Sequence, residues 1–285
     1  MSNQLTALDH SRDSAAMRYV YPVISRRAGG VSIGINLNTD NACNWRCIYC
    51  QVPNLKLGNA PTVDLLLLET ELRDFLQALL HGDFMQQRVP VEAQRINDFA
   101  ISGNGEPTSA AEFLAVVELL VKVKSQFPQL PAELKLVLIT NGSLLYRPLV
   151  QQALSVLAQH NGEVWFKLDR ASEVGMVKVN NTQIKLDKVR ENLLAAIACC
   201  PNTWLQTCWF AEDGVPPSAQ DEVDYLSLLE SLRQQNSAPK GVLLYGLARE
   251  SCQPEAPRLS ALSEAQMEQF AERIRKLGLT VKVSV

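Results

Sequence analysis

Short apolar runs recur along the chain at a regular distance from one another. Each run has the length and the residue types of a buried β-strand. From the second run onward the runs start roughly 30–40 residues apart, which is the size of a strand–helix–strand unit. The predicted strands are residues 31–37, 98–102, 134–140, 164–168, 204–210, 241–245 and 279–285.

Between the strands, apolar residues follow the helical repeat. Residues 113, 116, 117, 120 and 121 are all apolar, and this spacing places them on one helix face. Residues 267–277 show a similar spacing. Ser followed three positions later by Glu or Gln is typical of a helix start, and this pair occurs at residues 109–112 and 263–266. Both helices are therefore expected to begin with a capping box.

The alternation of strands with helices predicts a fold class. It favours a parallel sheet with right-handed crossovers between neighbouring strands. Six such units and a closing strand fit either an incomplete barrel or an open, doubly wound sheet, and the periodicity does not separate the two. In both folds the loops at the carboxyl ends of the strands carry the chemistry. Motifs that directly follow a predicted strand are therefore the candidate site residues.

Composition and charge exclude several classes of protein. Of the 285 residues, 47% are hydrophobic and 20% are charged, which is typical of a folded globule and not of a disordered or collagen-like chain. The 27 basic and 30 acidic residues give a net charge of -3, without the basic excess of a polyanion-binding protein. No apolar run approaches the ~18 residues of a membrane span, and residues 1–18 lack the apolar core of a signal peptide. We therefore expect a soluble, cytoplasmic protein with no membrane partner.

Three of the seven cysteines lie within eight residues, directly after the first predicted strand. Cys43, Cys47 and Cys50 have the spacing C-x3-C-x2-C, which brings three thiolates to one side of a loop. Three thiolates can hold three corners of a [4Fe–4S] cluster and leave the fourth iron open to a ligand. A structural zinc site needs a fourth ligand, and the three histidines of the chain lie outside the loop. Inert, buried thiols are a further alternative, which the polar character of the loop disfavours.

The cysteine loop resembles the signature of the radical SAM superfamily, C-x3-C-x-aromatic-C, with Tyr49 at the aromatic position. The resemblance implies a partial (β/α)6 TIM-type barrel of parallel strands in a single domain, with a short extra C-terminal strand. It implies that Cys43, Cys47 and Cys50 ligate a [4Fe–4S] cluster whose open iron is chelated by S-adenosyl-L-methionine (SAM). It also implies that Tyr49 contacts the adenine side of SAM. The core domain would be residues 21–285, after a polar N-terminal segment of residues 1–20.

A second motif, Ser102-Gly-Asn-Gly-Glu106-Pro-Thr108, follows the second predicted strand. It resembles the Gly-Gly-Glu motif of the same family, with Asn104 in place of the first glycine. The resemblance implies that Glu106 binds the amino group of SAM and that Gly103, Asn104 and Gly105 offer backbone contacts. A dinucleotide-binding loop is an alternative, but it lacks the third glycine, and a carboxylate would repel a pyrophosphate. A plain turn that caps a helix is another.

The third and fourth predicted strands end in further polar residues. The resemblance implies that Asn141, in a Thr-Asn-Gly turn, contacts SAM and that Asp169 holds its ribose hydroxyls. A plain turn and a salt-bridged aspartate are the respective alternatives. Lys167 is expected to point into the barrel, where its charge needs an anionic partner. Cys208 and Cys252 are expected near the same rim, either with a redox role or, more commonly for such residues, as small apolar side chains.

The function that this resemblance implies is reductive cleavage of SAM to methionine and a 5′-deoxyadenosyl radical, which abstracts a hydrogen atom from a substrate. Residues 21–32 resemble small iron–sulfur oxidoreductases described as wyosine-synthase-like. However, residues 1–42 contain no cysteine for an extra cluster, so the substrate is not carried over and stays open among a small molecule, a peptide and an RNA base. An external electron donor of flavodoxin or ferredoxin type is expected, since no flavin-binding domain is visible.

Two alternatives remain at this stage. One is a non-catalytic scaffold that holds zinc or an inert cluster, although such a scaffold needs neither Tyr49 nor Glu106. The other, within the enzyme class, is an RNA-base-modifying enzyme. A rim of basic residues at positions 26, 27, 46 and 56 would serve it, but four such charges are also normal for solvated loops.

Overall fold

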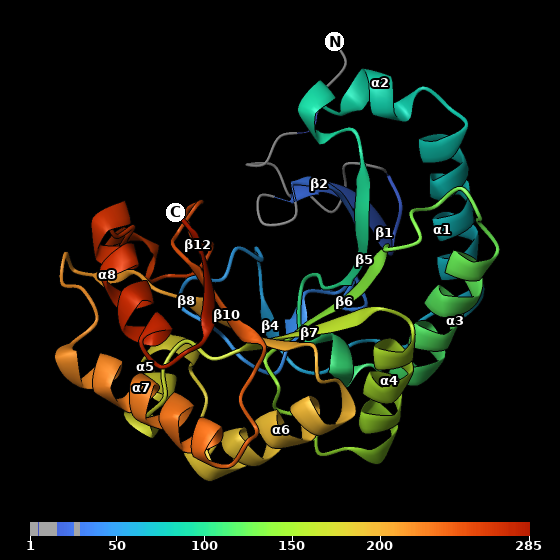
Figure 1. Cartoon of the computed structure of the whole chain (residues 1–285). Coiled ribbons are helices and arrows are strands. Elements are labelled where there is room, and N and C mark those ends of the chain that lie inside the picture. Colours follow the sequence, from blue (N-terminus) through green and yellow to red (C-terminus); the bar gives the residue numbers. More distant parts are fainter. Residues whose placement is uncertain (1–4, 6–15, 26–28) are drawn as a thin grey trace.

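The computed structural model describes residue 5, residues 16–25 and residues 29–285. In this part of the chain the main sheet has eight strands, whose spatial order is β1-β2-β5-β6-β7-β8-β10-β12. From β2 to β10 the order follows the chain and neighbouring strands run parallel, whereas a doubly wound sheet reverses its order at a switch point. The fold is therefore the predicted partial barrel (Figure 1). The strands are β1 (Val20–Ser25), β2 (Gly30–Ile35), β5 (Ile96–Ile101), β6 (Lys135–Thr140), β7 (Gly162–Lys167), β8 (Thr203–Cys208), β10 (Gly241–Tyr245) and β12 (Thr280–Ser284).

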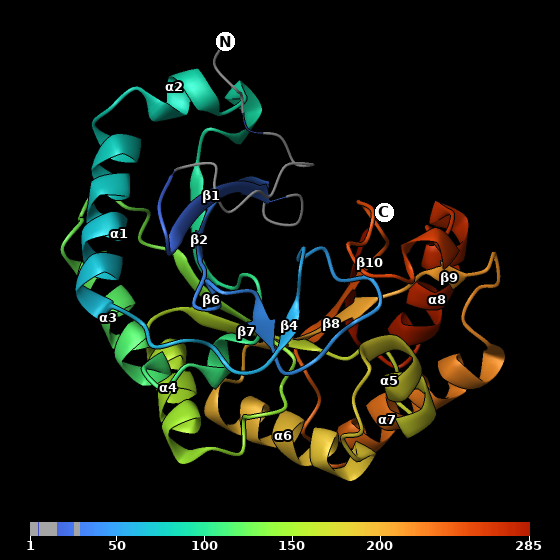
Figure 2. The same ribbon diagram turned by 180° about the vertical axis from the view of Figure 1, so that it is seen from behind.

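Helices cover the outer side of the sheet, and the apolar core lies between the two layers (Figures 1 and 2). Leu72, Val116 and Leu154 come from three of these helices and are fully buried. Within the described ranges, no helix is both long and apolar enough to cross a lipid bilayer. The helices are α1 (Leu65–Leu80), α2 (Phe84–Arg88), α3 (Phe113–Ser125), α4 (Pro148–Gln159), α5 (Glu173–Asn180), α6 (Leu186–Cys199), α7 (Ala219–Gln234) and α8 (Glu264–Arg275), with short 3-10 turns at η1 (Val91–Ala93), η2 (Pro107–Ser109) and η3 (Ala256–Arg258).

The edge strand β1 has no counterpart among the predicted strands. It pairs antiparallel with β2 and places Pro22 opposite Ile33. Proline interrupts the apolar run and donates no backbone hydrogen bond, so it is tolerated at a sheet edge. At the other edge, β12 pairs parallel with β10 as the expected closing strand. The predicted domain boundary at residue 20 falls at the start of β1, while residues 1–4 and 6–15 of the predicted N-terminal segment lie outside the described residues.

One of the two predicted capping boxes is wrong. Ser263 and Gln266 do form a capping box at the start of α8. Ser109 instead belongs to η2, where its hydroxyl donates a hydrogen bond to the carbonyl of Glu106 at 2.6 Å. The helix α3 begins only at Phe113, because the chain first makes the short turn that carries Glu106. Ser109 therefore stabilises the turn that carries Glu106 and does not cap α3.

Alternate residues of the strands face the inside of the barrel, because successive side chains of a strand point to opposite faces. Val137 and Ile139 of β6 and Trp165 and Lys167 of β7 all line the same internal cavity. The prediction that Lys167 points into the barrel is thereby confirmed.

Candidate active site

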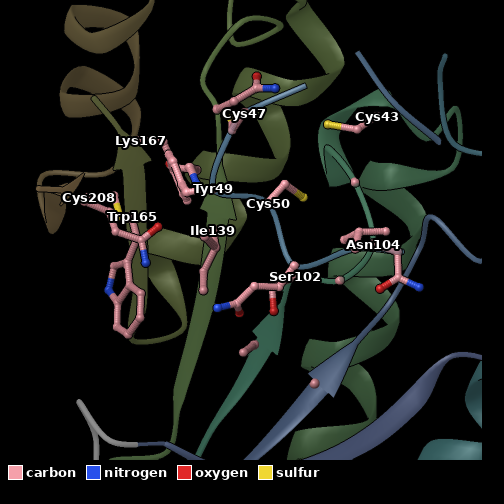
Figure 3. A pocket seen from close by; sticks show the side chains of 18 of the residues that line it. Cys43, Cys47, Tyr49, Cys50, Ser102, Asn104, Ile139, Trp165, Lys167 and Cys208 are labelled. Atoms are coloured by element: carbon pink, nitrogen blue, oxygen red, sulfur yellow. The ribbon is translucent and has the colours of Figure 1, made fainter. Parts of the chain in front are cut away.

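A cavity of about 290 Å³ lies inside the barrel, toward the carboxyl ends of the parallel strands. Strands from β1 to β10 and the loops that follow them contribute to its wall. Figure 3 shows Cys43, Cys47 and Cys50 at one end of the cavity, with Ile139 and Trp165 farther along the wall. This is the end of a barrel at which enzymes carry their chemistry. The predicted site residues that line the cavity are Cys43, Cys47, Tyr49, Cys50, Gly103, Asn104, Glu106 and Asn141.

The loop that carries the three cysteines follows β2, and a pair of short strands closes it. Its short strands β3 (Ala42–Cys43) and β4 (Lys56–Leu57) pair with each other on either side of the loop. Asn41, just before β3, has a φ of 63°, a left-handed conformation that asparagine tolerates better than most residues. The N–H of Cys50 donates to the carbonyl of Cys47 at 2.9 Å. These contacts fix the backbone of the loop that carries the three thiols.

Burial is the main influence on the pKa of two thiols of this loop, those of Cys43 and Cys47. It raises the pKa of Cys43 to about 12 and the pKa of Cys47 to about 11. Thiols with such pKa values are protonated at neutral pH, whereas the thiolate is the form that binds a metal. A metal bound by these two thiols would therefore displace their protons.

A site for a single metal ion brings its ligands together around one point. Among the described residues, no three His, Cys, Asp or Glu side chains are placed to hold one ion together. In an iron–sulfur cluster each thiolate ligates a different iron, so cluster ligands stand farther apart than the ligands of one ion. Three thiols at the end of one cavity are a donor set for a cluster of this kind.

Glu106 lies just after β5 and is buried at the start of η2. Its Oε1 accepts hydrogen bonds from the N–H and the hydroxyl of Thr108, at 3.1 and 2.6 Å, and from the hydroxyl of Thr140 at 2.6 Å. Its Oε2 accepts the N–H of Asn141 at 2.6 Å. Burial nevertheless raises the pKa of this carboxyl above its ordinary value. A buried carboxylate is stabilised by an opposite charge, so an ammonium group in the cavity suits Glu106.

The turn at Gly103, Asn104 and Gly105 packs directly against the cysteine loop. A Cβ atom at Gly105 would lie 2.0 Å from the carbonyl oxygen of Ala42, so only glycine fits there. Asn104 Nδ2 donates to Asn41 Oδ1 at 2.7 Å. The glycines therefore permit the close contact of two protein segments, in addition to any approach of a ligand.

Asn141 joins the carboxylate motif to the cysteine loop. Its backbone donates to Glu106, and its Nδ2 donates to Asn44 Oδ1 at 2.8 Å. The following Gly142 has a φ of 75°, and a Cβ atom there would lie 2.2 Å from the ring of Phe166. The turn thus requires glycine, and it holds Asn141 against both motifs.

Asp169 is not on the cavity wall but lies behind it, only 2% exposed. Its Oδ2 accepts hydrogen bonds from the hydroxyl of Tyr49 at 2.5 Å and from Asn180 Nδ2 at 2.7 Å. Its Oδ1 accepts the N–H of Cys208 at 2.8 Å. These contacts direct the carboxylate at protein donors, so the geometry gives no support to ribose binding, which stays a prediction. What Asp169 does here is hold Tyr49, whose ring also packs against Phe210 at a centroid distance of 5.5 Å.

Lys167 brings a positive charge to the cavity. Its Nζ lies 4.7 Å from the centroid of the Tyr49 ring. Burial by itself lowers the pKa of Lys167, but the acidic groups around it, Tyr245 and Asp169 foremost, raise it well above its usual range. The ammonium is therefore retained inside the barrel, where it attracts an anionic group of a ligand.

Of the remaining predicted rim cysteines, Cys208 lines the cavity and Cys252 does not. Cys252 is exposed, and its N–H donates to the carbonyl of Cys50 at 2.9 Å. It supports the cysteine loop through the backbone. Cys208 thus lies at the cavity wall but is fully buried, and its role stays a prediction.

The basic rim considered for an RNA substrate is weaker than its sequence suggests. Arg46 forms a two-pronged ion pair with Glu255 at 2.7 and 2.8 Å, which neutralises its charge. Lys56 is exposed in β4. Arg26 and Arg27 lie outside the described residues.

The contacts at the end of α5 have no counterpart among the predicted site residues. Asn180 Nδ2 donates to Cys47 Sγ at 3.2 Å, and Asn181 Nδ2 donates to the carbonyl of Arg46 at 2.8 Å. No motif marks these residues, and the only local signal is a pair of asparagines at the end of a helix, where the second takes the left-handed conformation with a φ of 49°.

No protein-family model matches the chain, but its fold is similar to that of solved structures. SuiB of Streptococcus suis, bound to S-adenosylmethionine, is similar with a TM-score of 0.57 at 10% identity, over 90% of this chain and 51% of SuiB. TYW1 with a lysine–pyruvate adduct bound is similar with a TM-score of 0.58 at 14% identity, over 86% and 73% of the two chains. Coproporphyrinogen III oxidase (HemN) of Escherichia coli, a radical SAM enzyme, gives a TM-score of 0.51 at 15% identity, over 98% and 59%. The chain therefore has the fold of radical SAM enzymes, and the resemblance seen in its sequence is confirmed at this level.

Among curated proteins, the chain is similar to the UPF0026 protein of Helicobacter pylori. The two are 31% identical over 175 residues, which are 61% of this chain and 49% of that protein. The UPF0026 protein of a second H. pylori strain is 31% identical over 176 residues. The chain spans about half the length of these curated relatives. Their name states no activity.

Proposed function

We propose that this protein is an enzyme that binds a [4Fe–4S] cluster and SAM and carries out radical chemistry on a substrate. One observation carries the proposal. The thiols of Cys43, Cys47 and Cys50 and the carboxylate of Glu106 border one cavity at the carboxyl ends of the parallel strands. A triad of thiols beside a buried acceptor for an ammonium group suits a cluster next to the methionyl part of SAM.

The chemistry of the reaction comes from the bound groups. A reduced [4Fe–4S] cluster held by the three thiolates would supply one electron to the sulfonium of SAM, whose S–C5′ bond breaks to give methionine and a 5′-deoxyadenosyl radical that takes a hydrogen atom from the substrate. The protein residues position these groups and keep water away from the radical.

Each role in the cavity follows from the contacts of the residue. Glu106 is held by Thr108, Thr140 and Asn141, and it accepts the ammonium of SAM. Tyr49 is fixed through Asp169 and offers the face of its ring beside the cysteine loop. Lys167 attracts an anionic group, either of SAM or of the substrate.

The proposal requires an electron donor. Cluster potentials span about −700 to +450 mV, and cleavage of a sulfonium needs the low end of this range. We propose an external donor of flavodoxin or ferredoxin type. Three substrate classes remain as proposals to be tested, namely a small molecule, a peptide and an RNA base.

The experiment is anaerobic reconstitution with iron and sulfide, followed by SAM and dithionite. The expected result is a brown protein with about four irons and four sulfides per chain that releases 5′-deoxyadenosine, measured by liquid chromatography and mass spectrometry. A colourless protein with stoichiometric zinc and no 5′-deoxyadenosine would reject the proposal in favour of a metal-binding scaffold.

A further inference from the structure

The end of α5 and the cysteine loop lie side by side and run in opposite directions. The carbonyl of Val179 accepts the N–H of Ile48 at 2.9 Å. The side chain of Asn180 reaches Cys47, and that of Asn181 reaches the carbonyl of Arg46. Three consecutive residues of the helix end thus contact three consecutive residues of the loop. The middle contact differs from the other two, because it ends on a thiol sulfur instead of the backbone.

The amide of Asn180 is shared between two acceptors. Its Nδ2 lies 3.2 Å from Cys47 Sγ and 2.7 Å from Asp169 Oδ2. An amide nitrogen carries two hydrogens, a carboxylate only accepts, and a thiolate only accepts. Asn180 is 1% exposed, so no water competes for either hydrogen. The two acceptors therefore determine the orientation of the amide, with one hydrogen directed at each.

Asp169 is in turn held in place. The hydroxyl of Tyr49 and the N–H of Cys208 both donate to it. A donor that aims at a metal-ligating sulfur is most effective when its own orientation is fixed by further hydrogen bonds. The chain from Cys208 and Tyr49 through Asp169 to Asn180 provides this support.

We propose that Asn180 is a positioning residue that sets the reduction potential of the cluster through its hydrogen bond to Cys47. The inference rests on the proposed function, because it requires a cluster on the three cysteines. Hydrogen bonds to the ligating sulfurs are among the factors that set cluster potentials. Reduction adds negative charge to the cluster and its sulfurs, so an N–H donor stabilises the reduced form more than the oxidised form. Asn180 therefore raises the potential toward the range that an external donor can supply.

The test is a redox titration of the reconstituted protein, followed by electron paramagnetic resonance of the reduced cluster. Asn180→Leu keeps the size of the side chain but donates no hydrogen bond. Its cluster is expected to be about tenfold harder to reduce, which is a midpoint ~59 mV more negative for one electron. Asn181→Gly is the matched control. It removes the neighbouring contact to Arg46, suits the left-handed conformation of residue 181 and is expected to keep the wild-type midpoint.

The outcomes separate this inference from the proposed function. A wild-type protein that takes up no cluster rejects both. A wild-type cluster whose midpoint is unchanged in Asn180→Leu rejects only the inference. Asn180→Ser, a smaller substitution whose hydroxyl is too short to replace the amide, serves as a second variant and is expected to shift the midpoint in the same direction. If neither variant takes up iron while Asn181→Gly does, Asn180 holds the ligand in place without setting the potential, and the inference is rejected.

Discussion

The hydroxyl of Tyr49 donates a hydrogen bond of 2.5 Å to Asp169, which lies 120 residues farther along the chain. The contact joins the loop after the first parallel strand, β2, to the end of the fourth, β7. Both side chains are buried, and the acceptor is a carboxylate. The hydrogen bond therefore belongs to the stronger class that involves a charged group.

Replacing Tyr49 by Phe removes this donor and leaves the ring in place. We expect the free energy of unfolding to fall by about 2 kcal/mol, measured by urea denaturation of the cluster-free protein. Tyr146→Phe is the control, because Tyr146 is 49% exposed and does not line the cavity. Equal stabilities of the two variants would show that the contact with Asp169 contributes nothing.

Replacing Cys43, Cys47 and Cys50 together by Ala is expected to abolish iron uptake. The three thiolates are the proposed cluster ligands, and no other residue of the loop has a comparable donor. Iron and sulfide analysis after anaerobic reconstitution measures the effect. Cys199→Ala, at the end of α6 and outside the cavity wall, should retain the wild-type iron content. Retention of a full cluster by the triple variant would refute the ligand assignment.

Replacing Glu106 by Gln keeps the shape of the side chain and removes its charge. A hydrogen bond to a charged group contributes about 1.5–3 kcal/mol, so the Kd for SAM should rise roughly 10- to 100-fold, as measured by titration calorimetry on the reconstituted protein. Glu112→Gln is the matched control, since Glu112 accepts the N–H of Val63 at 3.2 Å and does not line the cavity. Unchanged affinity in Glu106→Gln would mean that the ammonium of SAM binds elsewhere.

The affinity for SAM should also depend on pH through Glu106. Burial raises the pKa of this carboxyl in the folded protein, and only the ionised form pairs with an ammonium. The affinity is therefore complete above the raised pKa and is lost as the pH falls through it, at a higher pH than for an ordinary glutamate. Measurements of Kd as the pH is lowered from neutrality should show this decline in the wild type, because the pKa of Glu106 is raised, and a flat profile in Glu106→Gln. A parallel decline in both proteins would assign the titration to another group.

The strands of the main sheet other than β1, and the helices α3 and α8, could be predicted because their signals are local. A buried strand shows as an apolar run and a helix as a repeat of three and four residues, so both are visible within a short window. The run that forms β1 was hidden by Pro22, which an edge strand tolerates. Likewise, the pair at residues 109–112 has the local form of a capping box. The hydroxyl of Ser109 instead donates to the carbonyl of Glu106 and does not cap α3.

The sequence by itself determined the alternation of strands and helices, the cysteine spacing and the carboxylate turn, since each depends on residues that are close along the chain. Only the tertiary structure decided which way the polar side chains between these motifs point. Asp169 turns from the cavity to Tyr49, and Asn180 reaches Cys47 across 133 residues. Such contacts form because a buried polar group must find a partner wherever the folded chain provides one, and no short window of sequence contains both partners.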